Sequence, residues 1–356
     1  MEDTRLKALA DILVDYSLEV KKGERILIKT DEPEALPLMK ELYKKVLAKG
    51  GYPLVRTQPE VFDYLLATYG TKNQIINSWD SETYELGEIQ GRIRICAPKN
   101  PKIMANVNPG KFVLLQQKPG MLYYHRLDKI KWQLFYYPTE GLAQQMGMSL
   151  KETEDFIFKA CLKDWKKETK KMEKIKKVLD RGKIIRIKGN ETDISFSVKE
   201  RKGEVCGGKN NMPDGEVCYA PIESSINGHI FFEGLTIFEG KEMKDIFLKF
   251  KNGQLTKIEA DSGRDSLVSL TKIDRGAGRV GEFGIGCNYD INRITNETFF
   301  DEKIGGTIHL ALGDRINLDG KNRSDLHFDI IKDLRKEGEI YLDGKLVQKN
   351  GKFIFL

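Results

Sequence analysis

The sequence predicts an amino-terminal α/β domain with a parallel sheet, followed by a β-rich α+β domain. Before residue 183, apolar-periodic segments alternate with short β-branched runs, and this alternation favours a parallel sheet covered by helices. Beyond residue 183, alternating runs are joined by Asn-Gly, Asp-Gly and Lys-Asn-Gly turns, which are typical of antiparallel hairpins. We therefore expect two domains, at residues 1–182 and 183–356.

The amino-terminal half supplies the elements of the parallel sheet in order. The apolar-periodic segment LKALADILVDYSL predicts a helix before the strand GERILIKT, and EALPLMKELYKKVLAKG predicts a second helix before the strand GYPLVRT. Two further strands are expected in RIRICA and in WQLFYYP, where Pro138 ends the run. The lysine-rich segment 163–183 then predicts an amphipathic helix at the junction, because apolar residues recur there at helical spacing: Trp165, Met172, Ile175 and Val178.

The carboxyl-terminal half is predicted to be mostly sheet. Its runs include GKIIRIKG, DISFSVKE, GHIFFEGLTIFEG and GEIYLDGKLVQKNGKFIFL, each β-branched or alternating. A short helix is expected from Arg264 to about Gly276, before the strand GEFGIG at 281–286. Every candidate ligand named below lies in this half, and strands with their adjoining turns fix ligand geometry better than a flexible loop does.

Composition bounds the class of protein. The net charge of +6 raises the possibility of nucleic-acid binding, but lysines concentrate in segment 163–183, where acidic residues interleave with them. That pattern favours a solvated helix face, so we expect no nucleic-acid partner. The five cysteines lack Cys-x-x-Cys spacing, which argues against a disulfide framework or a structural zinc cluster. No signal peptide or membrane-spanning run is recognisable, and we expect a cytoplasmic protein without a membrane partner.

Two of the four histidines lie near acidic residues. His327 and Asp329 are two apart in LHFDII, so on a strand their side chains leave the same face. An imidazole beside a carboxylate suits a zinc- or manganese-type site, although such pairs often only hydrogen-bond. The other two histidines lack this acidic company, which favours the metal interpretation. With His309 in TIHLALG and Glu282 in GEFGIG, the sequence offers four candidate ligands.

Several motifs occur together in a specific order. They are NMPDGEVCYAP at 211–221, GEFGIG at 281–286, TFFDEKIGGTIHLALG at 298–313 and DGKNRSDLHFD at 319–329, after an amino-terminal segment at 11–56. With these motifs the chain resembles, over most of its length, the thermophilic aminopeptidase (leucine aminopeptidase T) family of co-catalytic metallopeptidases. The resemblance implies a metalloaminopeptidase that releases amino-terminal residues from short peptides with a water activated by two metals. It also implies a homodimer with its active sites in an interior cavity.

The resemblance also implies a ligand set and a catalytic residue. Five positions match the family's ligands for two divalent ions, zinc, cobalt or manganese, and these are Glu216, Glu282, His309, His327 and Asp329. Which carboxylate bridges the ions is left open. Glu282 is our first candidate for the general base, and Glu302 is the second.

One position departs from the family pattern. Family members commonly have a tyrosine seven residues after the histidine of the Ala-Leu-Gly motif, whereas this chain has Ile316. Losing one donor that stabilises a transition state can cost about a hundredfold in rate. Tyr219, Tyr289 or Arg315 are candidate substitutes. The alternative function is therefore a metal-binding relative whose peptidase activity is lost or altered.

Overall fold

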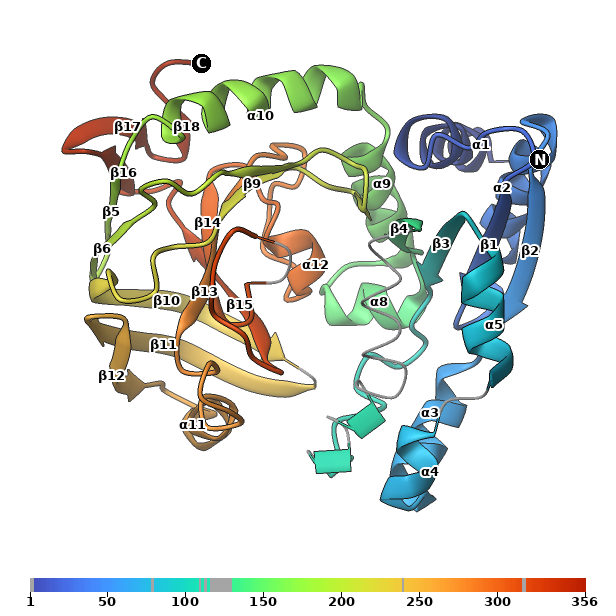
Figure 1. Ribbon diagram of the computed structural model, residues 1–356, viewed down its shortest axis with the longest axis horizontal. Coiled ribbons are helices and arrows are strands. Elements are labelled where there is room, and N and C mark those ends of the chain that lie inside the picture. The colour runs from blue at the N-terminus through green and yellow to red at the C-terminus, as the bar shows by residue number, and fades with distance from the viewer. Residues whose placement is uncertain are drawn as a thin grey trace. The chain divides into compact units, whose positions relative to one another are not determined.

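The computed structural model describes residues 3–77, 80–108, 110–111, 114–115, 130–238, 240–315 and 318–356. It divides into two compact units. The first comprises Met1–Lys163 with Gly208–Pro213, and the second comprises Asp164–Gly207 with Asp214–Leu356 (Figure 1).

The boundary lies about one helix earlier than the sequence predicts. Helix α10 (Trp165–Leu179) belongs to the second unit, because its apolar side packs into that unit's core through Met172, Ile175 and Leu179. The six residues Gly208–Pro213 belong to the first unit and supply its edge strand, β8 (Asn211–Met212).

The first unit is built on a five-stranded sheet with the order β2-β1-β3-β4-β8, in which every pairing is parallel. The predicted α/β domain with a parallel sheet is confirmed. Its strands are β1 Arg25–Thr30, β2 Tyr52–Thr57, β3 Gly91–Cys96, β4 Lys131–Tyr136 and β8 Asn211–Met212. Its α-helices are α1 Thr4–Asp11, α2 Leu36–Ala48, α3 Glu60–Tyr69, α4 Lys72–Ile76, α5 Asp80–Glu88, α8 Glu140–Gln145 and α9 Leu150–Cys161.

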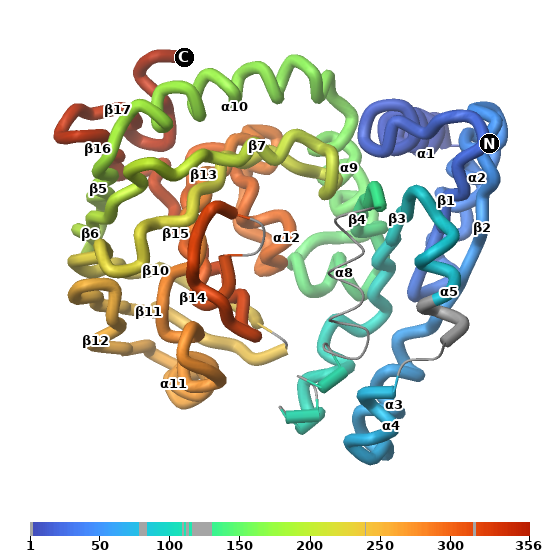
Figure 2. Tube along the Cα trace, viewed as in Figure 1, coloured from blue at the N-terminus to red at the C-terminus, as the bar shows by residue number. Residues whose placement is uncertain are grey.

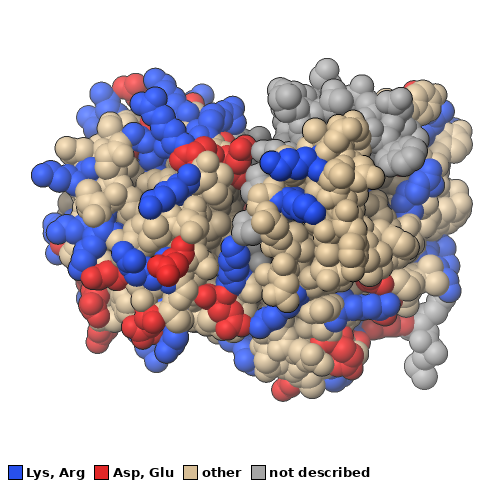
Figure 3. Space-filling view, turned by 90° about the horizontal axis from the view of Figure 1, so that it is seen from below, with Lys and Arg blue, Asp and Glu red and all other residues tan. Residues whose placement is uncertain are grey.

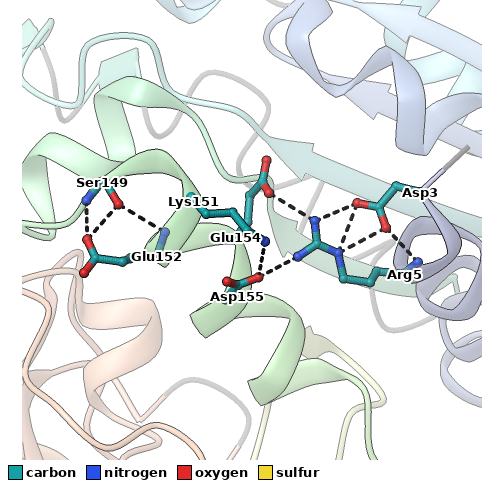
Figure 4. A network of polar contacts seen from close by, with 7 residues as sticks. All are labelled: Asp3, Arg5, Ser149, Lys151, Glu152, Glu154 and Asp155. Atoms are coloured by element: carbon teal, nitrogen blue, oxygen red, sulfur yellow. Dashed lines mark hydrogen bonds and ion pairs between the residues drawn. The ribbon is translucent and has the colours of Figure 1, made fainter. Parts of the chain in front are cut away.

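Helix α9 begins with a capping box. The Ser149 hydroxyl accepts from the Glu152 amide at 3.3 Å, and the Glu152 carboxylate accepts from the Ser149 amide at 2.8 Å. The next turn anchors the amino-terminal helix, because the Arg5 guanidinium pairs with Glu154 at 3.0 Å and with Asp155 at 2.8 Å (Figure 4). The network joins the first helix of the unit to its last.

The second unit contains two antiparallel sheets, so the predicted β-rich part is also confirmed. The eight-stranded sheet has the order β12-β11-β10-β6-β5-β16-β17-β18. Its strands are β5 Ile184–Gly189, β6 Thr192–Ser197, β10 Asn227–Phe238, β11 Lys241–Lys251, β12 Gln254–Glu259, β16 Glu339–Leu342, β17 Lys345–Lys349 and β18 Lys352–Phe353. The five-stranded sheet has the order β15-β14-β13-β9-β7. Its strands are β7 Glu204–Cys206, β9 Glu216–Tyr219, β13 Val280–Gly286, β14 Thr307–Gly313 and β15 His327–Asp333.

Two short helices complete this unit. Helix α12 spans Thr298–Asp301, and helix α11 spans Arg264–Leu270, shorter than the predicted helix that ends near Gly276. Residues 274–277 form a turn instead of continuing the helix, and in this turn the Asp274 carboxylate accepts from the amides of Gly276 and Ala277.

One face of the five-stranded sheet closes the core of the second unit. Alternate residues of β13, β14 and β15 point into that core, and the Phe283 ring meets the Phe196 ring of β6 edge-on at 5.0 Å. Figure 2 traces the chain through these strands. Each fully buried apolar side chain contributes about 1.5–3 kcal/mol. The opposite face of the same strands is held in place by this packing.

The surface carries both signs of charge. On the face shown in Figure 3, lysine and arginine side chains are interspersed with aspartate and glutamate. Among the described residues, no helix is both long enough and apolar enough to cross a membrane.

Candidate metal centre

Strand register gathers the candidate ligands on the non-core face of the five-stranded sheet. Residues directly opposite one another on paired strands point to the same face, as do residues two apart on one strand. The pairs on this face are Glu216 with Gly286, Gly284 with His309, Glu282 with Ala311, Ala311 with Asp329, and Gly313 with His327. The four strands β9, β13, β14 and β15 therefore each contribute at least one of the five residues.

The side chains converge. The His309 Nε2 atom lies 3.5 Å from Glu282 Oε1, 3.7 Å from Glu216 Oε2 and 3.9 Å from Asp329 Oδ1. The His327 Nε2 atom lies 3.1 Å from Asp329 Oδ2 and 3.9 Å from Glu282 Oε2. Glu282 and Asp329 each turn one oxygen towards each histidine. The structure thus brings together all five residues named from the sequence, and their role as ligands remains a prediction.

A backbone contact orients His327. Its Nδ1 atom lies 2.8 Å from the carbonyl oxygen of Asp314. Because a carbonyl only accepts, Nδ1 carries the hydrogen and donates it. In the neutral ring this leaves the lone pair on Nε2, the atom that faces Glu282 and Asp329, which is the usual arrangement of a metal-binding histidine.

The His309 ring depends on a glycine beneath it. A Cβ atom at Gly284 would lie 2.0 Å from His309 Cε1 and 2.1 Å from Nε2, far inside contact distance. The imidazole therefore occupies the space that any larger residue at position 284 would fill. This is why a glycine at position 284 of β13 matters to the site.

Four of the five candidate ligand side chains are buried, and some of their polar atoms lack hydrogen-bond partners among the described residues. Glu216, Glu282 and Asp329 are 6%, 8% and 8% exposed, and His309 is 1% exposed. Glu216 Oε2, His309 Nδ1 and Asp329 Oδ1 have no hydrogen-bond partner among the described residues. An uncompensated buried charge typically costs about 3–5 kcal/mol. Carboxylate oxygens left in this state, beside imidazoles, fit divalent cations such as zinc, cobalt or manganese.

When no cation is bound, protons bind to these side chains instead. Burial opposes a positive charge on His309, but Glu282, Asp329 and Glu216 outweigh it and raise its pKa to about 10. For His327, burial is likewise outweighed by Asp329 and Glu282, which raise its pKa to about 10. Burial raises the pKa of Glu216 to about 8. The ion-free site therefore binds protons that a cation would displace.

The sequence interpretation missed a buried lysine in this region. Lys303 has 0% side-chain exposure and forms an ion pair with Glu302, just after helix α12. Burial opposes its charge, but Glu302, Glu216 and Asp214 outweigh this and raise its pKa above the ordinary value. The Asp-Glu-Lys run at 301–303 was a visible signal, because a lysine inside an otherwise apolar motif needs an acidic partner.

The structure narrows the search for a substitute for the family tyrosine. Ile316 lies outside the described residues. Tyr219 points to the core face, opposite to Glu216, and its hydroxyl lies 2.8 Å from Asp180 Oδ1, so it is not a substitute. The Tyr289 hydroxyl donates to the Gly351 carbonyl at 2.8 Å and is already engaged. Arg315 has a buried Nε without a hydrogen-bond partner among the described residues.

Comparison with known families decides the broad class. A family model described as thermophilic metalloprotease (M29) matches residues 2–353, nearly the whole chain. The chain belongs to this family. It is therefore a metallopeptidase, a hydrolase that acts on peptide bonds.

Individual relatives of this M29 member are distant in sequence. Aminopeptidase 2 of Geobacillus stearothermophilus is 22% identical over 349 residues, covering 87% of this chain and 84% of that protein. Aminopeptidase T of Thermus thermophilus is 22% identical over 355 residues, covering 89% and 86%.

Two solved structures share its fold. AmpT from Thermus thermophilus matches with a TM-score of 0.86 at 19% identity, over 99% of both chains. The 2,5-dihydroxypyridine dioxygenase from Pseudomonas putida matches with a TM-score of 0.67 at 13% identity, over 99% of this chain and 97% of that one. The fold is thus shared with an enzyme whose name denotes another reaction, and fold alone does not determine activity.

We expect Gly284→Ala to lower the amount of divalent metal that the purified protein retains after dialysis. The added methyl displaces the His309 ring, because the two would lie about 2 Å apart. Gly189→Ala is the matched control in the second unit, since its added Cβ would meet nothing closer than 3.5 Å. Equal metal content in both variants, with both folded by circular dichroism, would show that the position of His309 does not govern binding.

The pKa shifts predict how the ion-free protein responds to pH. His309 and His327 have folded-state pKa values raised above their ordinary 6.5, so their contribution to stability is complete below about 6.5 and is lost as pH rises towards about 10. The free energy of unfolding of chelator-treated protein, measured in urea, should therefore fall between pH 7 and 10. The double variant His309→Gln, His327→Gln should show a flatter profile. If the free energy of unfolding fell equally steeply with pH in both proteins, the raised pKa values of His309 and His327 would be contradicted.

Proposed function

We propose that this M29 metallopeptidase removes amino-terminal residues from short peptides, using two divalent ions held by Glu216, Glu282, His309, His327 and Asp329. The convergence of these side chains on one sheet face, with buried oxygens that lack partners, is the observation that carries the proposal. Relatives named aminopeptidase 2 and aminopeptidase T support the choice of amino-terminal cleavage.

The arrangement supports two ions because it has two histidine centres. His309 lies with Glu216 on one side, and His327 lies on the other. Glu282 and Asp329 each place one carboxylate oxygen near His309 and the other near His327, so each is suited to bridge two ions. We propose Asp329 as the residue that would bridge the ions, because its two oxygens lie 3.9 and 3.1 Å from the two imidazoles and Glu282 then keeps an oxygen that can accept a proton.

Bound divalent ions supply an activated water and a Lewis acid for the scissile carbonyl. Groups of the chain itself orient the candidate ligands and set the local charge. The Asp314 carbonyl fixes the His327 ring, and Lys303 adds a buried positive charge beside Glu302. We assign general-base catalysis to Glu282, with a carboxylate oxygen receiving the proton of the water. Glu302 is the weaker candidate, because its carboxylate is already paired with Lys303.

Zinc, cobalt or manganese suits this mixed nitrogen and oxygen ligand set. The five cysteines are free thiols, which agrees with a reducing cytoplasm as the compartment.

The proposal is tested with paired substrates and a histidine control. Wild-type protein should cleave a leucyl anilide and leave its N-acetylated form intact, because the reaction needs a free amino terminus. His309→Ala and Asp329→Ala should each lose bound metal and activity, since each removes a ligand. His229→Ala is the control, because His229 stacks on Phe247 in the eight-stranded sheet. Either ligand variant with wild-type metal content and turnover would refute the assignment.

A second function is favoured by one observation, the isoleucine at position 316. Without the family's tyrosine, the chain could be a metal-binding relative with altered activity, and the dioxygenase of similar fold is an example of other chemistry. Metal retention without cleavage of any unblocked peptide would favour this alternative over the aminopeptidase.

Arg315 is our candidate for the missing electrophile. Arg315→Met should lower kcat on the order of a hundredfold with little change in KM, as expected for a group that acts mainly in the transition state. Ile316→Tyr in that background should restore part of the rate by returning the hydroxyl. An unchanged kcat in Arg315→Met would exclude the role of Arg315 as the electrophile. So would an unchanged kcat when Ile316→Tyr is added to metal-loaded Arg315→Met.

We also propose a homodimer, on the family resemblance. Helix α3 of the first unit exposes an apolar stripe suited to an interface: Val61, Phe62, Leu65 and Tyr69, at 40%, 61%, 40% and 79% exposure. Light scattering at micromolar concentration should give twice the chain mass of 40.7 kDa. Phe62→Glu should shift the mass towards the monomer. A monomeric wild-type protein would contradict the proposal.

A further inference from the structure

Two cysteine thiols lie beside the proposed ligands, on the same face of the five-stranded sheet. Cys206 of β7 is opposite Glu216 of β9, and Cys218 of β9 is opposite Gly284 of β13. Ligand atoms of Cys206, Glu216 and Cys218 all lie within 4.8 Å of one another. Two sulfurs and a carboxylate oxygen therefore form a compact group next to the metal centre.

The group is largely buried and contains an unsatisfied acceptor. Cys218 is 2% exposed and Glu216 is 6% exposed, and Cys206 packs against Cys218 in a small apolar cluster. Glu216 Oε2 has no hydrogen-bond partner in the described part of the chain. A buried carboxylate oxygen without a donor favours a cation nearby.

We propose that Cys206, Cys218 and Glu216 form an additional binding site for a thiophilic divalent ion such as zinc or cadmium. Thiolates select such ions over manganese, which prefers oxygen ligands. Two sulfurs and one oxygen occupy three positions of a tetrahedral zinc site and leave the fourth for water. Each thiol releases its proton to solvent as its sulfur binds the ion.

Strand register favours a shared ion over a disulfide. The two cysteines are not opposite each other, because Cys206 faces Glu216 while Cys218 faces Glu204. Such diagonal positions lie about 7–8 Å apart, whereas a disulfide needs Cα atoms within about 6.8 Å. Metal–sulfur bonds of about 2.3 Å allow one ion to join the two thiols without moving the strands.

The additional site competes with the proposed catalytic centre. Glu216 belongs to both, and Cys218 also forms a second close group with Glu282 and His309. An ion bound by the thiols draws the Glu216 carboxylate away from the His309 side. Excess thiophilic ion therefore inhibits hydrolysis, whereas excess manganese does not. This inhibition rests on the proposed function, but the binding does not.

The probe is cadmium, added to the reduced, manganese-loaded full-length chain and followed by the ultraviolet absorption of cadmium–thiolate bonds. Wild type should develop a saturable band, and Cys206→Ser and Cys218→Ser should each lose at least half of its amplitude. Their cadmium affinity should fall by more than the roughly 10–100-fold that follows loss of an outer partner. Cys287→Ser is the matched control and should keep the band, because the Cys287 thiol donates to the Ile285 carbonyl at 3.4 Å.

An unchanged band in Cys206→Ser overturns the proposal. So does loss of the band in Cys218→Ser alone, since the ion would then belong to the catalytic cluster. Fewer than five reactive thiols in denatured, unreduced wild type would indicate a disulfide and would also overturn it. The absorption needs no turnover, so a protein that binds cadmium as expected but cleaves no peptide supports this site and rejects the proposed function.

Discussion

Side-chain alternation in the five-stranded sheet is the constraint on which the site depends. Each strand sends every second residue into the apolar core and the others to the opposite face. On β13, Phe283 and Ile285 are buried in the core, while Glu282 and Gly284 take the other face. A shift of one residue in the pairing of any strand would exchange these faces and scatter the ligands. The core therefore fixes the register, and the register fixes the site.

Electrostatic strain is the consequence of this placement. Three buried carboxylates lie beside the buried His309 imidazole and the partly exposed His327 imidazole, and Lys303 lies beside Glu302 nearby. Replacing buried ion pairs by apolar residues of similar volume is often neutral or stabilising, because desolvating charges is costly. The chain retains charges whose compensation depends on a cation or on protons. Stability and ion binding are coupled for this reason.

Some of this architecture is predictable from sequence and some is not. The spacing of His327 and Asp329 alone predicts that they lie together, because a two-residue separation on a strand defines a common face. The same rule, applied to β9, would have excluded Tyr219, which is three residues from Glu216 and so points to the other face. The alternating runs and turns likewise predicted both sheet types.

Other features depend on contacts between distant segments, which periodicity does not reveal. Glu216 was identified only through family resemblance, because nothing near it in sequence marks a ligand. The proximity of Cys206 and Cys218 arises from the pairing of β7 with β9. The apolar spacing of helix α10 predicts the helix but not the unit against which it packs. Long-range pairing decided each of these cases.

Glu216 is the position where these constraints meet. Its backbone is fixed between β7 and β13, and its carboxylate lies 3.7 Å from His309 while sharing a close group with two thiols. One carboxylate cannot serve both groups equally, because its oxygens and its single negative charge are limited. Ions that prefer oxygen and nitrogen favour the histidine side, and ions that prefer sulfur favour the cysteine side. Under these two proposals, the choice of ion would determine which of the two adjacent sites is complete, without any movement of the backbone.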